Sequence, residues 1–156
     1  MTHKILSADD EPNIVISLEY LLQREGYAVL VARDGQEALD YLFCQGPYSD
    51  RNPDEQPELV LLDLGLPKLN GLQVLQRMRE DPRTFFVPVV MLTSSREEPD
   101  LMKAYELGVN AYVVKPVEFK DFVAAISDLG IFWAVLNEPP PGSLRLKRAR
   151  NKDEKN

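Results

Sequence analysis

The chain has 156 residues, of which 44% are apolar and 28% charged, enough for one domain with a core and too few for two. Its formal charge of −7, and apolar runs far shorter than the roughly 20 residues of a membrane span, argue against nucleic acid and membranes as partners. The single cysteine, Cys44, is typical of a reducing cytoplasm, and the single histidine, His3, excludes a histidine-based triad and a multi-histidine metal site.

Short apolar runs alternate with helical patterns five times along the chain, which predicts parallel βα units rather than hairpins. The expected strands are Lys4–Ala8, Tyr27–Val31, Glu58–Leu62, Val87–Leu92 and Asn110–Val114. Three of them are almost wholly apolar, as strands covered on both faces must be. The sequence therefore predicts an α/β fold with a doubly wound, five-stranded parallel sheet.

Helical periodicity fills the intervals between these strands. Pro12 suits a first helical turn, and apolar residues follow at helical spacing until Gly26. Asp34, with Glu37 three residues on, predicts a capping box that opens the second helix, which runs through about Phe43. The other predicted helices cover Gly71–Glu80, Asp100–Leu107 and a stretch from about Glu118 to Trp133.

Two segments depart from this alternation. Residues 45–57 are rich in Gly, Pro, Asp and Asn and exceed the usual connection of about 2 to 6 residues, so we expect a surface insertion. Residues 144–156 carry six basic and two acidic side chains and follow three consecutive prolines. We expect one domain over 1–137 and a proline-rich exit with a basic, disordered tail over 138–156, too short for a folded nucleic-acid recognition element.

Polar side chains stand at the ends of four of the five predicted strands. Asp9 and Asp10 follow the first strand, Asp63 the third and Lys115 the fifth, while Thr93 follows the fourth. In a parallel α/β sheet these strand ends share one edge, where ligands bind. Carboxylates that converge there need a cation such as Mg²⁺, and the lysine and hydroxyl suit a phosphoryl group. One carboxylate can then act as the nucleophile and form an aspartyl phosphate.

These residues lie in segments that, as a set, closely resemble the receiver domain of two-component response regulators. The segments are Ile5–Pro12 (ILSADDEP), Leu61–Pro67 (LLDLGLP) with Asn70–Gly71, Met91–Ser94 (MLTS) and Tyr112–Pro116 (YVVKP). They stand in the family's order over roughly residues 4–130. The resemblance implies a flavodoxin-like receiver fold with five helices and the strand order 2-1-3-4-5.

The resemblance also implies a role for each site residue. Asp63 matches the aspartate that accepts a phosphoryl group from a sensor histidine kinase, so the chain is a signalling phospho-acceptor and not an enzyme beyond its own phosphorylation and dephosphorylation. Asp10, Asp63 and the backbone carbonyl of Gly65 match the Mg²⁺ ligands, and Asp9 acts through water. Thr93 and Lys115 match the partners of the phosphoryl group, and Tyr112 matches the aromatic switch that follows Thr93.

Three features narrow the resemblance to the small regulators that accompany phytochromes: the insertion, the Phe132–Trp133 pair and the proline exit. A bacteriophytochrome is therefore an expected kinase. Phe132 and Trp133 either complete the core or form an interface, and a homodimer through the fourth helix, the fifth strand and the end of the fifth helix is the interface interpretation. Gly65 departs from many receivers because it lacks a side chain to shield the phosphoryl group, which predicts freer access of water.

Other interpretations of the same residues stay open. Tyr112 is alternatively an ordinary half-buried strand residue. A Mg²⁺-dependent phosphohydrolase of the haloacid-dehalogenase type would use a similar acidic edge, but such enzymes carry a second Asp two residues after the nucleophile, where this chain has Gly65. A receiver-like adaptor that works without phosphorylation is the second alternative function.

Overall fold

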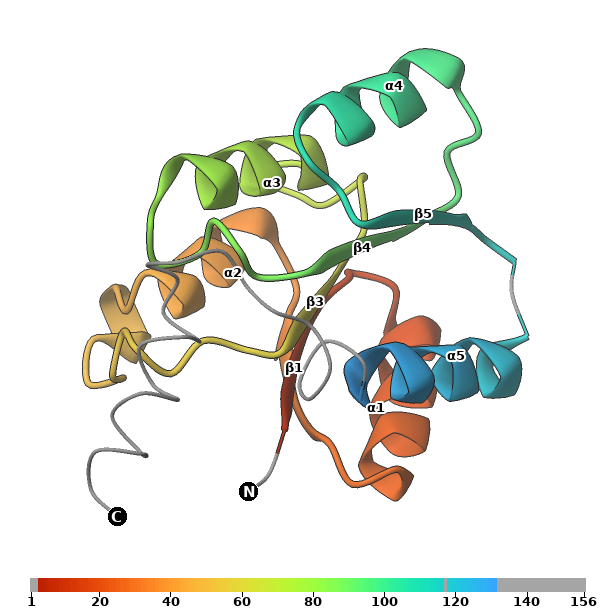
Figure 1. Cartoon of the computed structure of the whole chain (residues 1–156), viewed down its shortest axis with the longest axis horizontal. Coiled ribbons are helices and arrows are strands. Elements are labelled where there is room, and N and C mark those ends of the chain that lie inside the picture. The colour runs from red at the N-terminus through yellow and green to blue at the C-terminus, as the bar shows by residue number, and fades with distance from the viewer. Residues whose placement is uncertain (1–2, 117, 132–156) are drawn as a thin grey trace.

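The computed structural model describes residues 3–116 and 118–131, and in this part of the chain five parallel strands form one sheet in the order β2-β1-β3-β4-β5 (Figure 1). The strands are β1 (Lys4–Ala8), β2 (Ala28–Ala32), β3 (Leu59–Leu62), β4 (Val89–Thr93) and β5 (Ala111–Val114). The helices are α1 (Pro12–Arg24), α2 (Gly35–Leu42), α3 (Gly71–Glu80), α4 (Glu98–Glu106) and α5 (Phe119–Ile131), with a 3₁₀ turn at Gly46–Tyr48. This confirms the predicted fold class and strand order.

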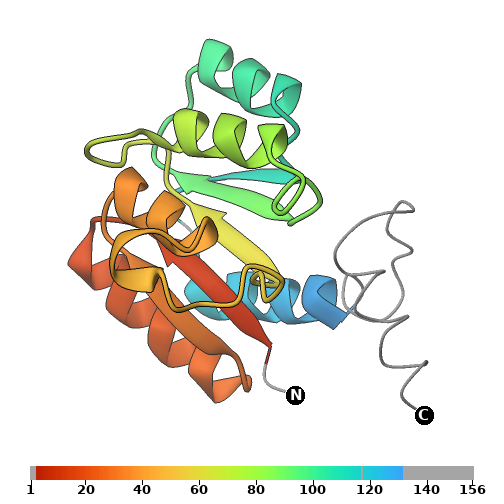
Figure 2. The ribbon, with the colours of Figure 1, turned by 90° about the vertical axis from the view of Figure 1, so that its left-hand side faces the viewer.

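Helices cover both faces of the sheet, with α1 and α5 on one face and α2, α3 and α4 on the other (Figures 1 and 2). Strand β3 is apolar at every position because both of its faces are buried. Val60 and Leu62 point into the cluster beneath α2 and α3, whereas Leu59 and Leu61 point into the cluster beneath α1 and α5. Because side chains alternate along a strand, a strand buried on both faces needs an apolar residue at every position.

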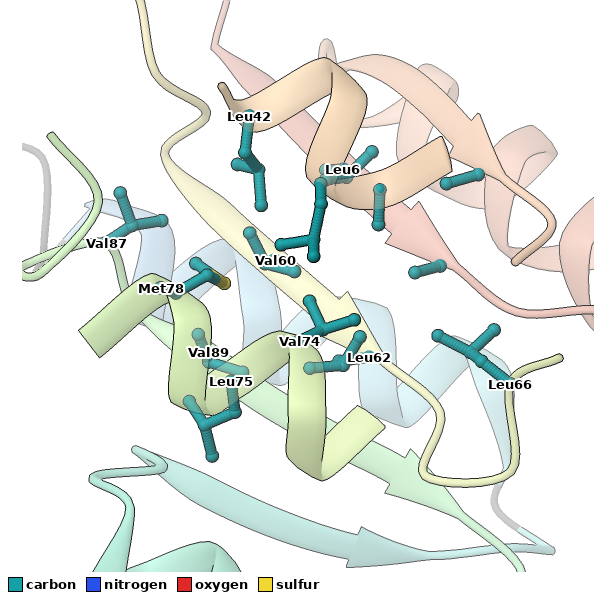
Figure 3. Packing of buried hydrophobic residues seen from close by; sticks show 14 of the residues in the cluster. Leu6, Leu42, Val60, Leu62, Leu66, Val74, Leu75, Met78, Val87 and Val89 are labelled. Carbon is teal, nitrogen blue, oxygen red and sulfur yellow. The ribbon is translucent and has the colours of Figure 1, made fainter. Parts of the chain in front are cut away.

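The larger of the two clusters joins strands β1, β3 and β4 to helices α2 and α3. Figure 3 shows Leu42 of α2 and Met78 of α3 on either side of Val60, and Leu42, Val60 and Met78 are fully buried. This packing fixes β3, the strand that Asp63 directly follows. Within the described residues, no helix has the length and apolar character needed to span a membrane.

Element ends agree with the sequence prediction to within two residues, with two instructive differences. Helix α4 begins at Glu98 rather than Asp100, because Pro99 fits the first turn, where a missing N–H costs nothing. The carboxylate of Asp34 accepts the backbone N–H of Glu37 at 2.7 Å, as predicted. The Glu37 carboxylate, however, accepts the backbone N–H of Arg33 rather than that of Asp34. The predicted capping box is therefore half formed. A complete one opens α3 at Asn70 and Gln73.

The predicted insertion, residues 45–57, packs on the end of α2. The Arg51 guanidinium lies 3.8 Å from the centre of the Tyr41 ring and donates to the Tyr41 carbonyl at 2.6 Å. Tyr48 meets Tyr41 edge to face, with ring centres 5.2 Å apart. The side-chain amide of Gln56, a buried residue, donates to the Leu42 carbonyl at 3.0 Å. These contacts tie both ends of the insertion to α2.

The predicted fifth helix is described as far as Ile131. Phe132, Trp133 and the predicted tail at 138–156 lie outside the described residues.

Candidate functional site

Backbone hydrogen bonds continue the sheet one residue beyond its strands and so fix the predicted site residues. Asp63 N–H donates to the Ala8 carbonyl at 2.9 Å, and Lys115 N–H donates to the Thr93 carbonyl at 2.8 Å. Asp9 N–H likewise donates to the carbonyl of Ala32, the last residue of β2, at 3.0 Å. All five strands are parallel, and in Figure 2 the arrowheads of β1, β3 and β4 point to the same side of the molecule, so the residues that follow the strands leave the sheet at one edge.

Three carboxylates converge at this edge. Asp9, Asp10 and Asp63 each offer an oxygen, and these oxygens lie within 4.8 Å of one another. Asp9 and Asp63 are buried, whereas Asp10 is exposed. Burial raises the pKa of the Asp9 carboxyl, although hydrogen bonds from the Glu11 N–H and from Lys115 oppose the shift. Close carboxylate oxygens of this kind are the ligands that a hard divalent cation prefers.

Lys115 neutralises part of this charge. Its Nζ lies 3.0 Å from Asp9 Oδ2, 3.3 Å from Glu11 Oε1 and 3.6 Å from Asp63 Oδ2, and its side chain is only 9% exposed. Burial disfavours the ammonium, but the hydrogen bond to Asp9 and the charges of Asp63, Asp9 and Glu11 outweigh burial and raise the pKa of Lys115. The ammonium therefore stays charged at neutral pH. The Lys115–Pro116 peptide is cis.

Ser95 connects two predicted site residues, Thr93 and Tyr112. Its N–H donates to Thr93 Oγ1 at 3.3 Å, and its carbonyl accepts the Tyr112 hydroxyl at 3.1 Å. Its own hydroxyl donates to Asp100 in the first turn of α4 at 2.6 Å. A displacement of Thr93 can therefore reach both Tyr112 and the start of α4 through one residue.

Two glycines shape the loop after Asp63. Gly65 donates its N–H to Asp63 Oδ1 at 3.3 Å, and a Cβ at Gly65 would meet nothing within 4 Å. Gly71, the first residue of α3, is crowded instead: a Cβ there would lie 2.8 Å from the Leu64 Cα and closer still to the Asp63 carbonyl oxygen. The start of α3 thus packs directly on the backbone of Asp63, while the space beside Gly65 is open.

The structure brings Asp9, Asp10, Asp63 and Lys115 together as predicted, with Thr93 and Tyr112 joined through Ser95. Sequence reasoning gave Glu11 no role of its own and treated Ser94 or Ser95 as a helix cap, whereas the N-cap of α4 is Glu97 and Ser95 connects Thr93 to Tyr112. A third acidic residue in the run Asp9-Asp10-Glu11 was the available signal for Glu11. Ser95 stands two residues after Thr93 and carries no comparable signal.

A comparison with family models matches residues 5–127 to the response regulator receiver domain. The chain belongs to the response regulator receiver domain family. It is a receiver domain of a two-component system, which makes it a signalling protein. A curated relative, the alkaline phosphatase synthesis transcriptional regulatory protein PhoP of Bacillus subtilis (strain 168), is 39% identical over 126 residues, or 81% of this chain. The chain spans about half of that relative, 48% of its length.

Several solved structures similar to this receiver are phytochrome response regulators. The bacteriophytochrome response regulator RtBRR is 54% identical, with 97% of this chain and 93% of that chain covered and a TM-score of 0.73. The phosphorylated cyanobacterial phytochrome response regulator RcpA is 31% identical, with 90% and 99% covered and a TM-score of 0.76. The Mn²⁺-bound response regulator Rcp1 is 32% identical, with 88% and 99% covered and a TM-score of 0.73. The predicted resemblance to phytochrome-associated regulators is confirmed.

Proposed function

We propose that this receiver accepts a phosphoryl group on Asp63 from a sensor histidine kinase and signals through the surface that the modification changes. The observation that carries the proposal is the position of the Asp63 carboxylate, which is buried, grouped with Asp9 and Asp10, and 3.6 Å from the Lys115 ammonium. A buried carboxylate with a cation close to it and open space beside Gly65 suits attack on an incoming phosphorus.

The carboxylate cluster fits a Mg²⁺ ion. Asp10, Asp63 and the Gly65 carbonyl are the proposed ligands, with Asp9 acting through water, and the Mn²⁺-bound state of Rcp1 supports a divalent ion in a related receiver. When bound, the ion supplies charge neutralisation for the phosphoryl oxygens. Asp10 is exposed, so this member of the cluster lies at the solvent side.

In the proposed reaction, an Asp63 carboxylate oxygen attacks the phosphorus of a phosphohistidine. The new O–P bond forms as the P–N bond breaks, and the imidazole keeps the electron pair and takes a proton. Lys115 and the Thr93 hydroxyl bind the phosphoryl oxygens, which fixes the group in place. Water later attacks the phosphorus and restores the Asp63 carboxylate and inorganic phosphate.

The proposed output runs from Thr93 to α4. When Thr93 turns toward the phosphoryl group, its contact with Ser95 changes, and with it the Tyr112 hydrogen bond. Helix α4 carries exposed apolar side chains that suit a partner surface, namely Leu101, Met102 and Tyr105. We propose a homodimer through α4, β5 and the end of α5, where Phe132 and Trp133 are the predicted contacts.

We propose that the receiver works in the cytoplasm and that its phosphodonor is a sensor histidine kinase of the bacteriophytochrome type. Similarity to RtBRR over nearly the whole of both chains supports this partner. The phosphorylated state of RcpA supports phosphorylation in the same group.

Borohydride reduction of the phosphorylated chain tests the acceptor residue. An aspartyl phosphate is reduced to homoserine, so peptide mass spectrometry after incubation with Mg²⁺ and acetyl phosphate should find homoserine at position 63. The Asp63→Asn variant is the matched control and should yield none. Homoserine at Asp9 or Asp10, or at no position, would overturn the assignment.

A further inference from the structure

The ammonium of Lys115 is shared by three carboxylates, and one of them lies outside the carboxylate cluster. Glu11 Oε1 accepts a hydrogen bond from Lys115 Nζ at 3.3 Å, closer than Asp63 Oδ2 at 3.6 Å. The Glu11 side chain is 55% exposed, in contrast to 5% for Asp9 and 8% for Asp63. Glu11 can therefore release Lys115 into a new contact without being stranded in the interior.

Helix capping does not explain why the Glu11 side chain contacts Lys115. Glu11 is the N-cap residue of α1, and its backbone carbonyl accepts the N–H groups of Ile14 and Val15, but its side chain makes no capping hydrogen bond. Asp, Asn, Ser and Thr are the residues that cap helices well. Instead, the carboxylate reaches a lysine 104 residues away in the sequence. The backbone of Glu11 is also held, because its N–H donates to Asp9 Oδ1 at 3.0 Å.

We propose that Glu11 is a positioning residue that holds Lys115 while Asp63 is unmodified and competes with the phosphoryl group for the same ammonium. The inference rests on the proposed function. When Asp63 becomes an acyl phosphate it loses its own charge, and the phosphoryl dianion becomes the natural partner of Lys115. The Glu11 carboxylate stays beside the ammonium as a rival anion. Phosphoryl transfer is slower because Lys115 must be separated from Glu11, and this separation costs free energy.

The half-exposed position of Glu11 sets the size of the effect. Exposed ion pairs contribute little, so the loss of this one should change a rate by about two- to fivefold rather than by orders of magnitude. Competition of this strength tunes the receiver without blocking it.

Two variants distinguish the contact between Glu11 and Lys115 from the general effect of a negative charge at position 11. Glu11→Gln keeps the length of the side chain and removes its charge, while Glu11→Asp keeps the charge and is one methylene too short for Lys115. Asp also caps α1 well, so Glu11→Asp should be at least as stable as the parent chain. Glu25→Gln, the same change at the exposed far end of α1, is the matched control.

The initial rate of phosphorylation by acetyl phosphate with Mg²⁺ should rise about two- to fivefold in both Glu11 variants and stay unchanged in Glu25→Gln. Unchanged rates in both Glu11 variants, with the parent chain phosphorylated normally, would overturn the inference and leave the proposed function intact. A rise in Glu11→Gln alone would also overturn it, because general charge would then be the cause. If the parent chain takes no phosphoryl group, the proposed function fails first.

A second measurement needs no metal and no phosphodonor. The ¹⁵Nζ resonance of the Lys115 ammonium, recorded by NMR on the metal-free protein, reports how well carboxylates protect its protons from exchange with water. Exchange should be faster in both Glu11 variants than in the parent chain and in Glu25→Gln. Equal exchange in all four proteins would show that Glu11 does not hold Lys115.

Discussion

Replacement of Gly71 by Ala should destabilise the receiver, because α3 begins in direct contact with the backbone that carries Asp63. The added Cβ would lie 2.8 Å from Leu64 Cα and 3.0 Å from the Asp63 carbonyl carbon. An ordinary van der Waals contact needs 3.4 Å or more, so the helix start and the loop must separate by roughly 0.6 Å at Leu64 and by more at the Asp63 carbonyl oxygen. Both sides of the contact are backbone, and no side chain can turn away to make room.

The magnitude follows from two opposed effects. Overpacking of this kind costs about 1–3 kcal/mol, and the rigid contact favours the upper end. Alanine regains up to about 1 kcal/mol because it is the better helix former. We therefore expect the free energy of unfolding to fall by about 2 kcal/mol, which lowers Tm by about 8 °C for a domain of this size.

Urea unfolding followed by circular dichroism measures this loss, and Gly65→Ala is the matched control. The Cβ of Gly65→Ala enters open space, so its free energy of unfolding should stay within about 0.5 kcal/mol of the parent chain. Equal stability of the two variants would refute the argument that the contact between α3 and the Asp63 backbone requires glycine.

Three further predictions concern other parts of the chain. Gly65→Arg should lengthen the lifetime of the aspartyl phosphate several-fold, because the side chain would shield Asp63 from water; an unchanged decay in a mass-spectrometric time course would contradict this. Arg51→Met should lower the free energy of unfolding by about 2 kcal/mol, through loss of the contact with the Tyr41 ring and carbonyl, and should speed proteolysis within residues 45–57; unchanged cleavage would show that Arg51 does not anchor the insertion. Joint replacement of Phe132 and Trp133 by Ala should lower the mass measured by light scattering from dimer to monomer, and an unchanged mass would remove them from the interface.

The acidic edge could be predicted from sequence because parallel strands deliver their carboxyl ends to the same place. Asp9 and Asp63 follow strands that are adjacent in the sheet, although 54 residues separate them in the sequence. Apolar runs that end in a charged residue were sufficient to find both. Tyr112, by contrast, needed the family resemblance, because a half-buried tyrosine in a strand is common without any switching role.

The contacts of Glu11 and Ser95 could not be predicted in the same way. Glu11 occupies an N-cap position, and no periodic pattern says that its carboxylate turns away from α1 toward Lys115. The contact of Arg51 with Tyr41 could not be predicted either, because it depends on how the insertion folds back on α2. Composition predicts a surface loop there but not the side chains that anchor it.

Intact-protein mass tests the central claim most directly. The chain is incubated with acetyl phosphate and Mg²⁺, beside the Asp63→Asn variant and a sample with a chelator. The account predicts that one phosphoryl group is added only when both Mg²⁺ and Asp63 are present. No added mass with any small phosphodonor would contradict it and favour a receiver-like adaptor that works without phosphorylation.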